Sequence, residues 1–129
     1  MIRILVISLF LLVNTFLSAQ VVSFVKYGVE NGLIQSQVQA FEQDDYGRLW
    51  VGTISGISVY DGVYFNNLTT KDSLAENWVT AMLKTKNGDM WIGHRAGSIS
   101  RWSKETNEIE NVSIERYNEF QTITQFVED

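Results

Sequence analysis

The stretch Val38-Gln-Ala-Phe-Glu-Gln-Asp-Asp-Tyr-Gly-Arg-Leu-Trp-Val-Gly52 recurs further along the chain as Val79-Thr-Ala-Met-Leu-Lys-Thr-Lys-Asn-Gly-Asp-Met-Trp-Ile-Gly93. The two copies lie 41 positions apart, so Trp50 falls on Trp91. A period near ~40 residues, with glycine and tryptophan at fixed places, indicates an array of similar structural units. We therefore expect a repeat protein.

The repeat extends in both directions from this stretch. Gly56 and Gly97 keep the same offset, and one inserted residue then brings Tyr60 onto Trp102. Upstream and at the end of the chain the register also continues. The matching pairs there are Phe24 with Phe65, Leu33 with Leu74, and Ile123–Asp129 with Val38–Asp44.

Each unit contains four short segments of strand-like composition, separated by turns. The pattern predicts strands at Val38–Gln43, Leu49–Thr53, Ile57–Tyr60 and Tyr64–Leu68, and in the second unit at Val79–Lys84, Met90–His94, Ile99–Trp102 and Ile109–Val112. Four strands per repeat of ~40–45 residues is typical of a propeller blade. The expected fold is all-β, made of four-stranded antiparallel β-propeller blades. Because closed propellers need ~4–8 blades, the sequence predicts an incomplete propeller.

The N-terminal segment has the pattern of an export signal. Arg3 is followed by an apolar run from Ile4 to Val13 and by a small residue at Ala19. That apolar run is short for a membrane-spanning helix, which takes ~20 residues, although an uncleaved anchor is the alternative. We expect a signal peptide at residues 1–19 and cleavage before Gln20.

These segments predict the organisation of the whole chain. Residues 20–37 would supply the outer strand of a closing blade and a linker, with the strand at Phe24–Tyr27. Residues 38–78 and 79–122 would form two blades, and residues 123–129 the first strand of a third, truncated blade. Trp50 and Trp91 recur at the structural period, so both are expected in the core.

Composition excludes several functional classes. The net charge is −5, which disfavours nucleic acid as a partner. Without cysteine, and with His94 as the single histidine, thiolate and histidine-rich metal sites are excluded. No motif predicts a cofactor, a metal site or catalytic residues, so we expect no enzymatic activity in this chain.

The first repeat, from Val38 to Thr53 and through Gly56-Ile-Ser-Val-Tyr-Asp-Gly62, resembles the two-component regulator propeller repeat. The lead-in Phe24-Val-Lys-Tyr-x-x-x-Asn-Gly-Leu33 is similar to the opening of such sensors. The resemblance implies extracytoplasmic propellers followed by a membrane helix and a cytoplasmic output module, commonly a histidine kinase. The second repeat departs from the pattern at His94 and Trp102.

One set of residues is a candidate for ligand binding. In a blade, the loop before the first strand and the turn between the second and third strands open on the same face. Trp78 lies in that loop and His94 and Arg95 lie in that turn, so the three could share a rim that holds an acidic sugar. The alternative is that Trp78 packs between blades.

The sequence and the resemblance together suggest a ligand-sensing propeller on the periplasmic or extracellular side, tethered to the inner membrane through the longer protein. It would detect a carbohydrate or another nutrient. The expected partners are a small-molecule or oligosaccharide ligand, the remaining blades and signalling domains, and a second copy in a homodimer. The alternative is part of a secreted propeller enzyme or adhesin that acts on or binds polysaccharide.

Overall fold

The computed structural model describes residues 2–3, 21–114 and 121–129. It contains two four-stranded antiparallel sheets, each with its strands in sequence order. The first sheet comprises β1 (Val38–Gln43), β2 (Leu49–Thr53), β3 (Gly56–Tyr60) and β4 (Phe65–Leu68), and the second comprises β5 (Val79–Lys84), β6 (Met90–His94), β7 (Ile99–Trp102) and β8 (Ile109–Val112). We call these sheets blade 1 and blade 2. The all-β prediction is confirmed, and every strand bound lies within one residue of the predicted one.

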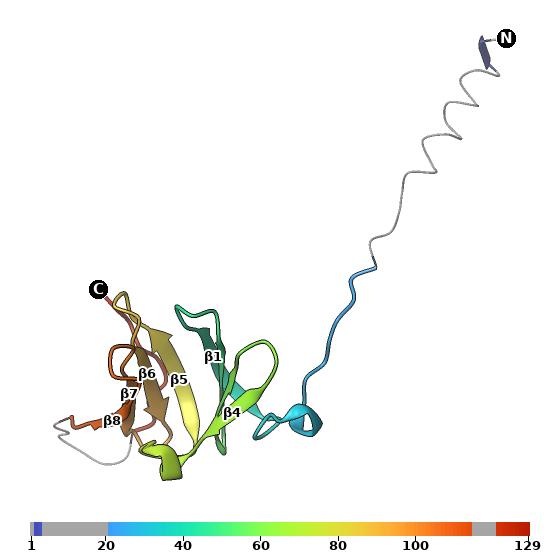
Figure 1. The fold of residues 1–129 in the computed structure, drawn as a ribbon. Helices are drawn as coiled ribbons and strands as arrows, with labels where there is room; N and C mark the ends of the chain where they lie inside the picture. Colours follow the sequence, from blue (N-terminus) through green and yellow to red (C-terminus); the bar gives the residue numbers. More distant parts are fainter. Residues whose placement is uncertain (1, 4–20, 115–120) are drawn as a thin grey trace.

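The two blades stack face to face, and the core lies between them (Figure 1). Strand β1 lies beside β5, and β2 also contacts β5. Trp50 from blade 1 meets Trp102 from blade 2, with ring centroids 5.2 Å apart. The remaining buried members of this core are Ile57, Val59, Leu74, Val79, Met90 and Ile92.

Gly52 explains how closely the blades approach. A Cβ at this position would lie 2.6 Å from Val79 Cγ1 and 3.1 Å from Met82 Sδ. Any side chain there would push β5 away from β2, because such contacts are shorter than van der Waals separation. The glycine after the tryptophan is therefore required for blade packing.

The repeat includes the connections as well as the strands. Two 3-10 turns, η2 (Val29–Asn31) and η3 (Thr70–Asp72), lie 41 positions apart, and in each the side chain of the last residue accepts a hydrogen bond from the backbone N–H of the residue before the turn. Each is followed by a buried leucine, Leu33 or Leu74. The loop that enters each blade is thus built in the same way.

The inserted residue lies in the β6–β7 turn. Gly52 pairs with Ile57 in blade 1, whereas Gly93 pairs with Ile99 in blade 2. Tyr60 and Trp102 are consequently equivalent, as predicted. The match of Gly56 with Gly97 is wrong in structural terms, because the longer turn displaces Gly97 from that position.

Two predicted strands are absent. Residues 21–28 have no regular secondary structure, and Phe24 is 90% exposed, because no neighbouring strand in the described residues pairs with Phe24–Tyr27. Residues 121–129 also form no strand. They nevertheless lie against blade 2, where the Ile123 N–H donates to the His94 carbonyl over 3.2 Å.

The prediction that both repeated tryptophans are core residues holds for only one of them. Trp50 is 1% exposed, whereas Trp91 is half-buried. Both occupy the same register in their sheets, but blade 2 covers Trp50, whereas the ring contacts of Trp91 in the described part of the chain are with Phe126 and Arg101. The predicted signal peptide at residues 1–19 lies outside the described residues except for positions 2 and 3, and stays a prediction.

Candidate functional site

The antiparallel pairing of β5 and β6 places two of the three predicted site residues together. Val79 pairs with His94, so the preceding Trp78 lies beside the following Arg95. The Arg95 N–H donates to the Trp78 carbonyl over 3.2 Å. The Arg95 guanidinium carbon lies 4.1 Å from the centroid of the Trp78 ring, a cation–π contact. Arg95 is exposed and Trp78 is half-buried. We call this pair the rim pair.

His94 does not reach this surface, so the prediction that it lines the rim is wrong. Its side chain is fully buried, and Nε2 lies 2.9 Å from Ser100 Oγ on β7. Burial lowers the pKa of His94 below its usual value, although the charge of Glu76 and the Trp78 carbonyl act in the opposite direction. His94 is therefore uncharged at neutral pH, and its side chain points into the sheet packing rather than to the rim.

Glu76 holds the rim in place, a role that the sequence did not reveal. Its Oε1 accepts a hydrogen bond from the Ala96 N–H over 3.1 Å, and its Oε2 accepts one from the Ser98 hydroxyl. Burial alone would raise the pKa of Glu76, but these bonds and nearby His94 bring it below the usual value. The carboxylate therefore fixes the β6–β7 turn under Arg95.

The rim is specific to blade 2. In blade 1 the residues 41 positions before Glu76, Trp78 and Arg95 are Gln35, Gln37 and Ile54. Gln35 bonds only to its own neighbours Ser36 and Gln37. Blade 1 consequently lacks both the aromatic ring and the cation.

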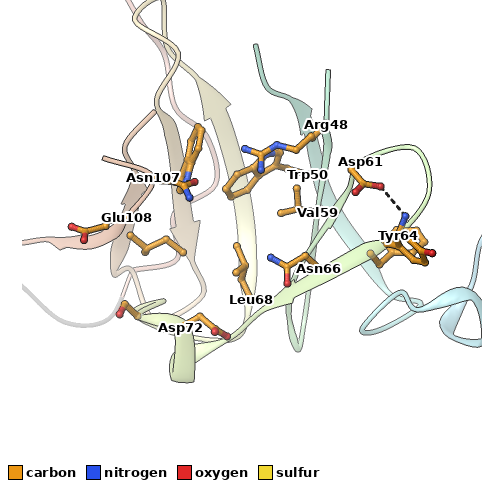
Figure 2. A pocket seen from close by; sticks show the side chains of 14 residues that line it. Arg48, Trp50, Val59, Asp61, Tyr64, Asn66, Leu68, Asp72, Asn107 and Glu108 are labelled. Atoms are coloured by element: carbon orange, nitrogen blue, oxygen red, sulfur yellow. Dashed lines mark hydrogen bonds between the residues drawn. The ribbon is translucent and has the colours of Figure 1, made fainter. Parts of the chain in front are cut away.

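A separate groove of about 660 Å³ lies between the outer strands of the two blades. Figure 2 shows side chains from both blades around it. The floor includes Trp50 and Trp102, both almost completely buried. The other lining residues are Arg48, Val59, Asp61, Tyr64, Phe65, Asn66, Leu68, Asp72, Ser73, Asn107, Glu108 and Ile109.

Several polar groups of this groove are already engaged in local structure. Asp61 accepts 2.8 Å hydrogen bonds from the Val63 and Tyr64 N–H groups, the latter drawn in Figure 2. Asn107 accepts from Trp102 Nε1 over 3.1 Å. The groove is therefore best explained as the outward divergence of two blades that touch at their inner strands.

Asp44 organises the β1–β2 turn next to this groove. Its carboxylate accepts hydrogen bonds from the backbone N–H groups of Tyr46 and Arg48, from Arg48 Nε and from Trp50 Nε1, at 2.7–2.9 Å. Burial tends to raise its pKa, but the bonds from Trp50 and Arg48 outweigh burial and lower it. Asp44 is thus a buried anchor for Trp50.

The described part of the chain also bears on other site classes. Within it, no group of three or more His, Asp or Glu residues could hold a metal ion. No helix in residues 2–3, 21–114 and 121–129 has the length and apolar character required to cross a bilayer.

Stacked four-stranded sheets with a 41-residue repeat define a repeat protein of the β-propeller class. Residues 32–55 and 73–96 each match the family described as Two component regulator propeller. Two segments of the chain therefore match the repeat of this family, as the sequence resemblance indicated. A comparison with curated proteins found no match.

Proposed function

We propose that this chain is part of an extracytoplasmic sensor propeller of a two-component signalling receptor, and that the rim pair binds an acidic sugar or a similar anionic nutrient. The two family repeats support the class, since the family describes two-component regulator propellers. The proposal assigns recognition, not catalysis, to this chain. A propeller alone hosts many activities, so the ligand has to be argued from the rim.

The state of Arg95 carries the ligand proposal. Its side chain is exposed and has no ion pair among the described residues, while the nearby carboxylate of Glu76 is bonded to Ala96 and Ser98. A guanidinium held over an aromatic ring is preorganised for a carboxylate, which it can bind through two parallel hydrogen bonds. The uncovered part of Trp78 offers apolar contact to a sugar ring.

Calorimetric titration of the exported chain with glucuronate, with glucose as the neutral comparison, tests this proposal. We expect binding of glucuronate and none of glucose, and loss of glucuronate binding in Arg95→Gln. Arg101→Gln is the matched control, because Arg101 also lies over a tryptophan, Trp91, but is paired with Glu110. Equal effects of the two substitutions, or turnover of an oligouronide by the chain, would contradict the proposal.

Export is the second part of the proposal. The charged, apolar and small-residue sequence of positions 1–19 supports it. A fusion of residues 1–20 to a reporter that is active only outside the cytoplasm should be active, and mass spectrometry should find a mature N-terminus at Gln20. A full-length cytoplasmic product would contradict this localisation. In the receptor, further blades and signalling domains, and a second copy in a dimer, would complete the assembly.

A further inference from the structure

The two successive docking surfaces of this chain are built on the same apolar geometry. On blade 1, Gly52 lies against Val79 and Met82. On blade 2, the equivalent Gly93 lies against Ile123, and a Cβ there would be 3.2 Å from the Phe126 ring. Ile123 and Phe126 thus pack against blade 2 in the same way as Val79 and Met82 pack against blade 1. The apolar packing against the two glycines is therefore alike on the two blades.

Beside Gly52, blade 1 contributes an acidic side chain to the contact and blade 2 contributes basic ones. Asp45, in the β1–β2 turn, accepts from Lys84 Nζ through Oδ1 and from Lys104 Nζ through Oδ2, both at 2.8 Å. Lys84 ends β5, and Lys104 follows β7. One carboxylate of blade 1 therefore joins two lysines of blade 2.

The corresponding positions on blade 2 and its docking segment carry charges of the opposite sign. Lys86 occupies the position equivalent to Asp45, and its backbone N–H donates to Glu128 Oε1 and Oε2 at 3.1 and 2.9 Å. Its Nζ donates to the Asp129 carbonyl over 3.0 Å. Glu128 follows Ile123 at the same spacing as Lys84 follows Val79. The residues at these two positions thus have the opposite signs to Asp45 and Lys84, and Lys86 reaches Glu128 through its backbone N–H while its ammonium group reaches the Asp129 backbone oxygen.

We propose that the turn between the first two strands of each blade selects its docking partner by charge, so that blade 1 accepts a basic strand and blade 2 accepts an acidic one. The segment 121–129 is the acidic partner of blade 2. On blade 1 its Glu128 would face Asp45, and β5 docked on a copy of blade 2 would bring Lys84 to Lys86. Like charges at contact distance disfavour both wrong pairings. The order of blades therefore follows from charge as well as from chain connectivity.

Hydrogen exchange of the Ile123 amide in the whole chain reports the docking of this segment, because that amide bonds to the His94 carbonyl. Glu128→Lys should lower its protection by about fivefold, the upper end for an exposed charge contact. Glu105→Lys is the matched control, since Glu105 is exposed in the β7–β8 turn and the net charge changes equally. The control should leave Ile123 protection unchanged.

The double substitution Lys86→Asp with Glu128→Lys restores opposite charges in the reversed order, and it should recover the protection of Ile123. Amides of β1–β3 should exchange as in the parent chain throughout, which excludes global unfolding as the cause. If Glu128→Lys behaves like Glu105→Lys, or if the double variant remains as unprotected as the single one, apolar contact alone selects the partner and the proposal is wrong. High salt should reduce the difference between the variants.

Discussion

Equivalent faces of the two blades differ in what covers them. The face of blade 1 that carries Trp50 is covered by blade 2, and Trp50 is 1% exposed. The same face of blade 2, with Trp91, meets residues 121–129, and Trp91 stays half-buried. On the opposite faces, Val79 is fully buried against blade 1, while its counterpart Val38 is 44% exposed. Identical residue types at identical register thus differ in burial because burial depends on the neighbouring sheet.

The largest expected effect concerns the two tryptophans. Trp50→Ala should destabilise the chain by about 3–5 kcal/mol, since it leaves a cavity against Trp102 in the core. Trp91→Ala should cost about 1–2 kcal/mol, because that side chain is already partly exposed to water. Urea unfolding followed by far-UV circular dichroism measures both. Equal losses of unfolding free energy in the two variants would contradict the claim that only the Trp50 face is covered by a neighbouring blade.

The turn carboxylate of blade 1 gives the next largest effect. Asp44→Asn keeps one oxygen for the Tyr46 and Arg48 backbone groups but places an amide donor against Arg48 Nε and Trp50 Nε1. The loss of these bonds to a buried charge should cost about 2–3 kcal/mol. Asp61→Asn is the matched control, because the carboxylate of Asp61 is exposed and bonds only to local backbone. The same unfolding experiment should show a much smaller loss for this control, and equal losses would contradict the anchoring role.

The smallest expected effect is a pH dependence at the contact between the blades. Hydrogen bonds from Lys104 and Lys84 lower the pKa of Asp45 to about 2. A carboxyl with a lowered pKa in the folded state stabilises fully above its unfolded value, near 3.8, and loses that contribution as pH falls through about 2. The midpoint of thermal unfolding of Asp45→Asn should therefore lie below that of the parent chain at pH 5. The two should converge between about pH 4 and pH 2, and a gap that persists below pH 2 would contradict this assignment.

The fold could be predicted from the sequence because strand alternation, turn glycines and a fixed period are local signals. Leu49–Thr53 and Met90–His94 are strands in the structure as the repeat predicts. The single insertion could not be placed by matching Gly56 with Gly97, since backbone pairing decides where the extra residue lies.

The site was less predictable because it depends on contacts between loops. The adjacency of Trp78 and Arg95 follows from antiparallel pairing of their strands, which the sequence indicated. The burial of His94 depends on Ser100 across the sheet, and the role of Glu76 depends on a turn twenty residues away. Neither relation leaves a pattern in one sequence. The outer strand predicted at Phe24–Tyr27 stays a prediction, because a strand requires a partner and no strand of the described residues pairs with it.

The four indole N–H groups test the difference between the blade faces most directly. In the structure, Trp50 Nε1 donates to Asp44 and Trp102 Nε1 donates to Asn107. Both tryptophan side chains are buried between the blades. Two-dimensional NMR of the chain should resolve four indole signals. Those of Trp50 and Trp102 should exchange slowly and show a nuclear Overhauser contact between their rings, while those of Trp78 and Trp91 exchange rapidly. A Trp91 indole as protected as that of Trp50, or no contact between Trp50 and Trp102, would contradict the stacked-blade account.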